Sequence, residues 1–272
     1  MSLSAPAGGA PVSRVAAEQA WQDYWADRAV RDEDFGLISF RRIMLQELQR
    51  ELQTRPHGLL RLLNAGCGLD PMPAFLLPDY PEIEIYLLDI APGCLEANHR
   101  YLSHRLSPEQ VSRLHCQAGS VFELPWPAGH FDVVYHTGLL EHFSAHDQVQ
   151  ILSEICRVLK PGGSYVALHP SSRGRLYLLM KRYWEQSGQW PYGPEQPLGS
   201  LKAQVQRAFG QVSVRERNLD FWQTAEMLAR HDNQALAWIG SKLRNATRWQ
   251  VAERLLLWIL GGYVLLTSAT KE

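Results

Sequence analysis

Two glycines and one acid stand where they could bind a nucleoside. Gly66 and Gly68 directly follow an apolar run, and glycines at such a strand-to-helix turn let the backbone bend sharply and approach a ligand closely. Asp89 ends the next apolar run, twenty-one residues past Gly68. A carboxylate at that place can accept hydrogen bonds from both hydroxyls of a ribose. The combination predicts a nucleoside site, and a solvated strand-end aspartate is the alternative.

The residue two positions past Gly68 bears on which nucleoside this is. A dinucleotide site has a third glycine near this position, and this chain has Asp70 followed by Pro71. An acid facing a pyrophosphate is repulsive, whereas the same acid beside a cationic amino-acid group is favourable. This contrast favours S-adenosylmethionine (SAM) over NAD as the ligand.

These residues need a scaffold, and the pattern of apolar runs indicates one. Five short runs alternate with helical stretches: LLRLLN (59–64), IEIYLLD (83–89), LHCQAG (114–119), FDVVYHT (131–137) and SYVALH (164–169). Near-continuous apolar strands separated by helices are typical of a parallel sheet that is covered on both faces. The predicted fold class is therefore α/β, with a Rossmann-like doubly wound sheet.

Three helices are predicted from apolar side chains spaced three and four residues apart. The first begins near Ser13, the second runs over 34–53 and the third runs over 145–160. The first carries Trp21 and Trp25 one turn apart on one side. An Arg-Pro-His-Gly turn ends the second helix, and a Pro-Gly-Gly turn ends the third.

Taken together, the motifs resemble those of class I SAM-dependent methyltransferases of the broad small-molecule type. The similarity covers 58–170 well and 171–272 in outline. It rests on LLNAGCGLD (62–70), AGSVFELPW (118–126), FDVVYHTGLLEHF (131–143) and LSEICRVLKPGGSYVAL (152–168). The resemblance implies SAM as cofactor, and it implies these cofactor-binding residues: Asn64, Gly66, Cys67, Gly68, Asp89, Ile90, Ser120, Val121, His136 and Thr137.

The chain departs from the family pattern at three of its polar positions. Asn64 stands where the family has its first acid, and Asp70 stands where it has the third glycine. Ser120 stands where a loop acid usually contacts the adenine amino group. A serine hydroxyl can still form a hydrogen bond at that place.

The resemblance also implies how the chain is organised. Residues 209–217 and 261–271 resemble the antiparallel C-terminal hairpin that closes the family's mostly parallel sheet. The implied division is an N-terminal helical cap (1–57), a SAM-binding core (58–170) and a remainder of the same domain (171–272). This last part would hold the substrate-lid helices and the closing hairpin.

The family reaction is an in-line displacement at a methyl carbon, so the protein supplies alignment and, where needed, a base. His136, His142 and His169 are the candidate bases, because they fall at the carboxyl edge of the predicted sheet, although each could instead be a structural hydrogen-bonding residue. Quinone-pathway O-methyltransferases similar to this stretch hold a metal on two acids and a histidine. Gly138 replaces the first acid and leaves only Glu141 beside His142, so no metal is predicted.

The acceptor must be recognised by residues outside these motifs. Six of the nine tryptophans follow position 180, and as a set they favour an apolar or aromatic small molecule, with helix packing as the alternative: Trp184, Trp190, Trp222, Trp238, Trp249 and Trp258. Residues 1–171 carry a net charge of −7 and residues 172–272 one of +6, which would suit a protein or lipid-linked acceptor. The whole chain has a net charge of −1, which argues against a dedicated nucleic-acid binder.

Compartment and membrane contact follow from composition. The four cysteines show no CxxC spacing, which indicates a reduced, cytoplasmic protein: Cys67, Cys94, Cys116 and Cys156. The apolar run 255–267 is too short to span a bilayer and contains Gly261-Gly262, so it predicts a helix end, a turn and a buried strand, with a peripheral membrane contact as the less favoured alternative.

The sequence thus predicts a cytoplasmic SAM-dependent methyltransferase that acts on an O or N atom of a small organic metabolite. A protein or lipid-linked acceptor is the first alternative, a non-catalytic SAM-binding partner subunit the second and an NAD-dependent oxidoreductase a distant third. The acceptor, the attacked atom and the oligomeric state are left open.

Overall fold

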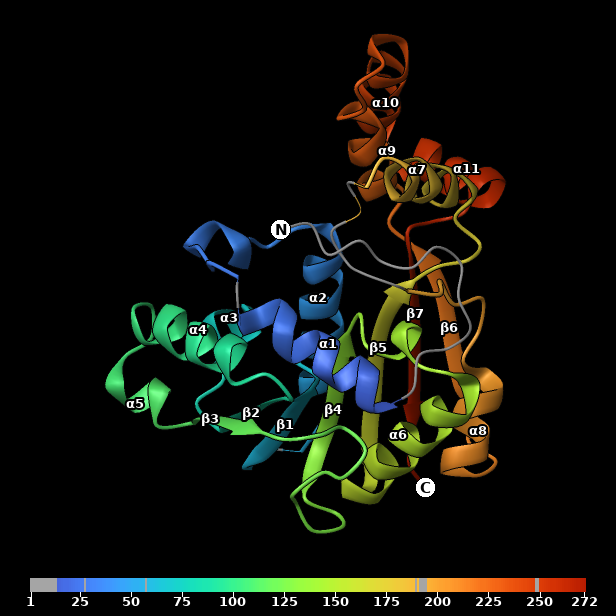
Figure 1. The fold of residues 1–272 in the computed structure, drawn as a ribbon. Coiled ribbons are helices and arrows are strands. Elements are labelled where there is room, and N and C mark those ends of the chain that lie inside the picture. The colour runs from blue at the N-terminus through green and yellow to red at the C-terminus, as the bar shows by residue number, and fades with distance from the viewer. Residues whose placement is uncertain (1–13, 27, 57, 189, 191–194, 248–249) are drawn as a thin grey trace.

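The structure is a computed structural model that describes residues 14–26, 28–56, 58–188, 190, 195–247 and 250–272. Its centre is a seven-stranded sheet with strand order β3-β2-β1-β4-β5-β7-β6 (Figure 1). The strands are β1 (Leu60–Ala65), β2 (Ile83–Asp89), β3 (Leu114–Ala118), β4 (Phe131–Thr137), β5 (Leu159–Pro170), β6 (Val214–Leu219) and β7 (Val264–Thr270). The first five are parallel, and β7 runs antiparallel to both β5 and β6. The predicted fold class, including the antiparallel C-terminal pair, is confirmed.

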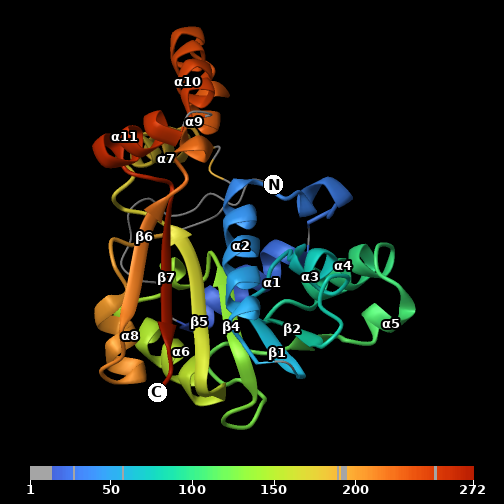
Figure 2. The ribbon, with the colours of Figure 1, turned by 180° about the vertical axis from the view of Figure 1, so that it is seen from behind.

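Helices cover both faces of this sheet (Figures 1 and 2). On one face α2 (Ser39–Gln53), α3 (Met72–Leu76) and α4 (Pro92–Ser103) pack on the strands, and on the other face α6 (Ala145–Val158) and α8 (Lys202–Phe209) do so. Successive side chains of a strand point to opposite faces. Tyr135 of β4 therefore joins the first core and Val134 joins the second. Coverage of both faces explains the near-continuous apolar runs.

The remaining helices lie around the ends and edges of the sheet. They are α1 (Arg14–Ala26), η1 (Asp32–Phe35), α5 (Pro108–Val111), η2 (Leu140–His142), α7 (Arg175–Gln186), α9 (Phe221–Ala229), α10 (Gln234–Ala246) and α11 (Gln250–Leu260). Helices α7, α9, α10 and α11 lie together beyond the carboxyl ends of β5 and β6 (Figure 1). Within the described part of the chain, none of the helices has the length and apolar character that a membrane crossing requires.

Two helix boundaries differ from the sequence-based expectation. The helix predicted over 34–53 is split into η1 and α2, because Gly36 takes an extended backbone with ψ of 140°. The Arg41 side chain holds this bend by donating to the carbonyl oxygens of Asp34 and Gly36 at 2.8 and 2.9 Å. The helix predicted over 145–160 ends at Val158, because Leu159 pairs with β4 and already belongs to β5.

The apolar run 255–267 folds as predicted, with a helix end, a turn and a buried strand. The turn needs glycine for steric reasons. A Cβ atom on Gly261 would lie 2.0 Å from the carbonyl oxygen of Arg173, and one on Gly262 would lie 2.0 Å from that of Leu219. The two glycines thus let the segments that contain Arg173 and Leu219 pass close to the chain just before β7.

Candidate active site

A pocket of about 370 Å³ opens at the carboxyl ends of the parallel strands. Its walls come from the segments that follow β1, β2, β3, β4 and β5. Strands β1 and β4 are neighbours in the sheet. The strand that follows β1 in the chain, β2, lies on one side of this pair, and the strand that follows β4, β5, lies on the other. Ligands of open α/β sheets bind at such a switch point. The topology therefore brings the predicted motifs to one place.

The loop after β1 forms the floor of this pocket through its backbone. Gly66 and Gly68 adopt φ values of +71° and +48°, which side chains other than glycine rarely allow. The backbone N–H groups of Gly66 and Cys67 donate to the carbonyl oxygen of Leu88 at 2.8 and 2.9 Å. A Cβ atom on Gly66 would also lie 2.8 Å from Leu139. The glycines thus let the loop fold back tightly on the end of β2.

Asp89 is held at the end of β2 by the same loop. Its carboxylate accepts hydrogen bonds from the backbone N–H groups of Gly68 at 2.9 Å and Ala91 at 3.0 Å. Burial raises the pKa of Asp89, and these two hydrogen bonds oppose that rise. Each carboxylate oxygen has a second lone pair, so the side chain can still accept hydrogen bonds from a ligand in the pocket.

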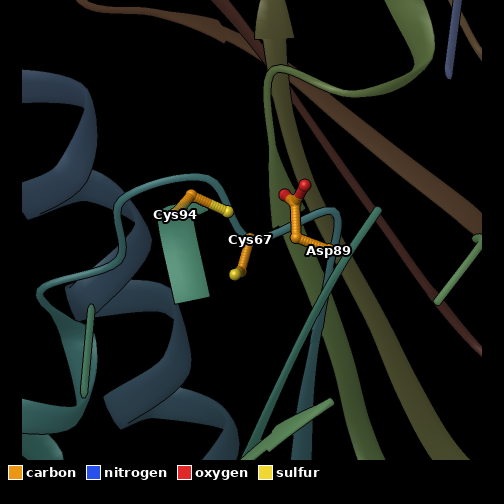
Figure 3. Close-up of side chains that lie close together, drawn as sticks. All are labelled: Cys67, Asp89 and Cys94. Atoms are coloured by element: carbon orange, nitrogen blue, oxygen red, sulfur yellow. The ribbon is translucent and has the colours of Figure 1, made fainter. Parts of the chain in front are cut away.

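Two thiols lie beside this carboxylate (Figure 3). The ligand atoms of Cys67, Cys94 and Asp89 lie within 4.8 Å of one another, a spacing that a metal ion could use. The Cys67 thiol points away from the Asp89 carboxylate (Figure 3). Burial raises the pKa of Cys67 well above its ordinary value, so without a bound cation this thiol is protonated. We therefore interpret the two thiols as neutral packing groups beneath the loop.

Asp70 does not take the part that the sequence interpretation gave it. It is 3% exposed, does not line the pocket and accepts hydrogen bonds from Asn64, from the Tyr135 hydroxyl and from the Met72 backbone. The Met72 contact satisfies an N–H group at the start of α3, as a carboxylate commonly does there. An acid turned into the protein makes no direct contact with a ligand in the pocket. Asp70 therefore does not select SAM over NAD, contrary to the sequence-based expectation.

Helix α1 supplies pocket residues that the sequence interpretation missed. Glu18 accepts a hydrogen bond from the Ser120 hydroxyl at 2.6 Å, and both residues line the pocket. Trp21 and Trp25 line it as well. The spacing of these residues over two helical turns was a usable signal, because positions i, i+3 and i+7 share one face. The loop after β3 has Ser120 at the position where an acid is usual. Glu18 of α1 thus supplies a carboxylate beside that position.

The other end of the pocket contains two histidines beside the buried carboxyl of Glu141. The Nδ1 atom of His169 lies 3.2 Å from Glu141, and the Nε2 atom of His142 lies 3.9 Å from it. Burial would raise the pKa of Glu141, but the hydrogen bond with His169 and the charges of both histidines outweigh it and lower the pKa. The buried carboxyl is therefore ionised.

Glu195 completes this cluster from a distant loop. Its carboxyl accepts a hydrogen bond from the Tyr177 hydroxyl at 2.6 Å, and burial together with the Glu141 charge raises the pKa of Glu195 to about 8. The ligand atoms of Glu141, His142 and Glu195 lie within 4.8 Å of one another. Sequence reasoning weighed only Glu141 and His142 there, since nothing local marks Glu195. The absence of a metal remains a prediction.

His136 lies below the pocket rather than in its wall. It is fully buried, its Nε2 atom lies 2.9 Å from the Tyr165 hydroxyl, and its ring centre lies 5.0 Å from that of His169. Asn64 is buried in the Asp70 network and does not line the pocket either. The other expected cofactor residues do line it: Gly66, Cys67, Gly68, Asp89, Ile90, Ser120, Val121 and Thr137.

The late tryptophans do not form a pocket wall. Among the described residues, none of Trp184, Trp190, Trp222, Trp238 and Trp258 lines the pocket, and Trp249 lies outside the described residues. The aromatic wall instead comes mainly from α1 and the strand ends: Trp21, Tyr24, Trp25, Phe40 and Tyr263. Helices α9 to α11 lie beyond the sheet, so their tryptophans pack between helices or face outward.

Comparison with known proteins agrees with this geometry. Residues 63–167 match the family model described as "Methyltransferase domain". These residues therefore correspond to a methyltransferase domain. Its overall fold is similar to that of geranyl diphosphate C-methyltransferase from Streptomyces coelicolor, with a TM-score of 0.62 and 13% identity over 97% of this chain and 100% of that one.

Curated relatives share only part of their length with the chain. It is 30% identical to an uncharacterized methyltransferase of Schizosaccharomyces pombe over 38% of this chain and 37% of that protein. It is 28% identical to malonyl-[acyl-carrier protein] O-methyltransferase of Laribacter hongkongensis over 50% of this chain and 46% of that protein. The chain thus spans less than half the length of these two relatives.

Proposed function

We propose that the protein transfers a methyl group from SAM to an O or N atom of a small organic molecule, with His169 as the general base. The observation that carries this proposal is the 3.2 Å contact between His169 and the ionised Glu141 in the wall of the pocket. A hydroxyl or amine loses a proton when it is methylated, and a positioned histidine can accept that proton.

The residues at one end of the pocket fit the cofactor. Asp89 would accept hydrogen bonds from the ribose, and Gly68, where a Cβ atom would have only Trp25 at 3.6 Å as a described neighbour, leaves room for close backbone approach. Ser120 and Glu18 would face the adenine, because they line the wall beyond Asp89. SAM supplies an electrophilic methyl group on a sulfonium, which is already a good leaving group.

The Glu141 contact fixes which histidine nitrogen is basic. An ionised carboxylate only accepts hydrogen bonds, so the Nδ1 atom of His169 carries the hydrogen and the Nε2 atom keeps its lone pair. Within the described part of the chain, that Nε2 atom is buried and has no hydrogen-bond partner, so it can take a proton only from an acceptor molecule that opens the pocket wall. Glu141 therefore acts as the positioning residue that holds the tautomer needed for proton removal.

The wall near this histidine favours a small acceptor with an apolar or aromatic body. Ile38, Phe40 and Tyr263 line the pocket together with His142 and Glu195. Large apolar surfaces with a few convergent polar groups are typical of small-molecule sites. A protein or lipid-linked acceptor and a non-catalytic SAM-binding partner remain the alternatives.

Transfer can be tested before the acceptor is identified. The protein is incubated with methyl-labelled SAM and a metabolite extract, and the products are analysed by mass spectrometry. Label in a small molecule is the expected result. Label on protein would support the first alternative, and binding of SAM without any label would support a non-catalytic role. Equal turnover with and without a chelator is expected from the metal-free interpretation.

Substitutions then test the base on the identified acceptor. His169→Ala is expected to lower kcat by about 10²–10⁴-fold with little change in SAM affinity. Glu141→Gln should lower kcat and shift its pH profile, because the neutral amide no longer selects the tautomer. His130→Ala is the control, since His130 precedes β4 at the opposite end of the sheet. A loss in His142→Ala or His136→Ala alone would move the role to that histidine.

A further inference from the structure

The helices beyond the carboxyl end of the sheet expose an unusual share of large apolar side chains. Twelve such side chains are exposed in the described part of the chain, and eight of them lie on α7, α9, α10 and α11. Four of the eight are Leu179, Trp222, Trp238 and Ile239, and the other four all belong to α11. Scattered exposed apolar residues are ordinary, but a gathered set marks an interaction surface.

The four residues on α11 form one continuous stripe. Val251, Leu255, Trp258 and Ile259 are 82, 56, 83 and 45% exposed. Their spacing of four, three and one residues puts them on a single face of the helix. We call these four residues the α11 stripe. A helix whose outward face is apolar and carries an exposed tryptophan is typical of a contact with a membrane interface or a partner.

The charges around the stripe are mainly basic. Helices α7, α9, α10 and α11 together contain six Lys and Arg against three Asp and Glu. Glu185 already pairs with Lys181, and Glu226 pairs with Arg230 and Arg244. Exposed side chains with no acidic partner among the described residues remain on α7, α10 and α11: Arg182, Lys242 and Arg254. The third acid, Glu253, lies beside Arg254 on α11, so the excess positive charge near the stripe comes from α7 and α10.

We propose that the α11 stripe docks on the surface of an anionic lipid bilayer, with Trp258 at the interface and the surrounding basic residues near the headgroups. Apolar insertion and attraction to anionic lipids act together on such helices. A second copy of the chain fits less well, because a two-fold contact through this face would bring two basic surfaces together.

Docking here would bring the bilayer close to the candidate active site. A second hollow, of about 810 Å³, lies between α2, the end of β6, α9 and α11, and Arg254 and Leu257 of α11 line it. Ile38 lines both this hollow and the active-site pocket. Docking through α11 would thus place the bilayer beside this second hollow, which shares one wall residue with the active-site pocket. Use of the hollow by a bilayer-borne acceptor would rest on the proposed function, whereas the docking itself does not.

Vesicle flotation with the whole chain tests the proposal. Binding is expected with mixed phosphatidylcholine and phosphatidylglycerol vesicles, with much weaker binding to pure phosphatidylcholine and weakening by salt. Leu255→Glu and Trp258→Glu should each lower the partition coefficient by about tenfold or more. Leu59→Glu is the matched control, because Leu59 is 51% exposed, close to the 56% of Leu255, but precedes β1 at the other end of the sheet.

Three results would overturn it. They are no binding to either vesicle type, equal loss in the Leu59 control, or a dimer without vesicles that Leu255→Glu dissociates, which would assign the stripe to a second copy. Unchanged melting temperatures confirm that the variants fold. None of these measurements uses methyl transfer, so a failure of the proposed function and a failure of docking would be seen separately.

Discussion

The two ends of the pocket are built in different ways. We call the end with Asp89 the cofactor end and the end with His169 the acceptor end, after their parts in the proposed function. At the cofactor end, Gly66, Gly68 and Asp89 come from one short stretch of chain, and a backbone N–H group links the loop to the acid. At the acceptor end, Glu141 and Glu195 come from segments far apart in sequence and meet beside the end of β5. The first end depends on backbone geometry and the second on which side chains the fold brings together.

This difference separates general from particular function. A backbone cradle accepts few substitutions, because a Cβ atom or a changed φ angle alters the loop itself. A side-chain cluster can change one residue at a time while the sheet beneath it stays intact. The cofactor end therefore carries the motifs shared with other methyltransferase domains, and under the proposed function the acceptor end sets which molecule is methylated. Substitutions in each end should have correspondingly different effects.

The largest effect is expected at the cofactor cradle. Gly68→Val should abolish detectable SAM binding, because a β-branched residue is strained at φ of +48° and its side chain would enter the pocket. Gly129→Val is the matched control, since Gly129 has φ of +69° and no described atom within 4 Å of an added Cβ. Calorimetric titration measures both. Equal losses of affinity would mean that strain alone, not the cradle, is responsible.

The next largest effect concerns the two acids of the neighbouring loops. Asp89→Ala should weaken S-adenosylhomocysteine binding by on the order of 100-fold, because hydrogen bonds to a charged group each contribute roughly 1.5–3 kcal/mol. Asp70→Asn should lower the melting temperature but leave the affinity of the folded protein nearly unchanged, since Asp70 bonds only inward. The ligand-induced melting shift, roughly 5–10 °C for the parent chain at saturating ligand, reports both.

A smaller effect is expected from α1. Glu18→Gln should weaken S-adenosylhomocysteine binding several-fold, because the amide replaces the charged partner of Ser120 in the pocket wall. Asp23→Asn is the control, since Asp23 lies on the exposed side of the same helix and bonds only to Gln19 among described side chains. If both variants bind alike, α1 contributes bulk and not a specific contact.

The smallest effect is a pH dependence of stability at the acceptor end. The pKa of Glu195 is raised from 4.5 to about 8, so between these values the folded chain holds a proton that the unfolded chain has lost. The free energy of unfolding should therefore fall as pH rises through this window. Glu195→Gln should flatten the fall. Asp220, with a pKa raised by burial to about 6, titrates in both proteins, so melting temperatures differ most above that pH.

If the melting temperatures of the parent and the Glu195→Gln protein fall equally with pH above about 6, Glu195 does not hold its proton in the folded chain. The cluster would then carry two ionised carboxyls, Glu141 and Glu195, which would favour a bound cation and argue against the metal-free interpretation.

Much of the fold could be predicted from the sequence, because strands buried on both faces leave an unmistakable run of apolar residues. Strands β1, β2, β4 and β5 and the cofactor loop depend on local patterns of this kind, whereas the edge strand β3 is mostly exposed. The split before α2 could not be foreseen, since it depends on Arg41 reaching back to two carbonyl oxygens. Propensity patterns do not include such contacts.

The acceptor end was predicted only in part. His142 and His169 were found because strand ends and motif positions mark them, and their roles remain predictions. Glu195 was missed because it contributes through a loop with no periodic pattern. The error over Asp70 has a different origin: its position in the motif was recognised correctly, but the direction of its side chain is set by Asn64 and Tyr135, which sequence spacing does not reveal.

The positions of Asp89 and Glu18 at the cofactor end of the pocket have a consequence for kinetics. Under the proposed function these residues hold the adenosyl group, which SAM and S-adenosylhomocysteine share, so they stabilise substrate and product complexes alike. Such uniform binding lowers KM without raising kcat. It also makes S-adenosylhomocysteine a competitive inhibitor of SAM binding. Sustained turnover then depends on how fast S-adenosylhomocysteine is removed from solution, and the rate of methylation becomes a measure of the ratio of the two cofactor forms.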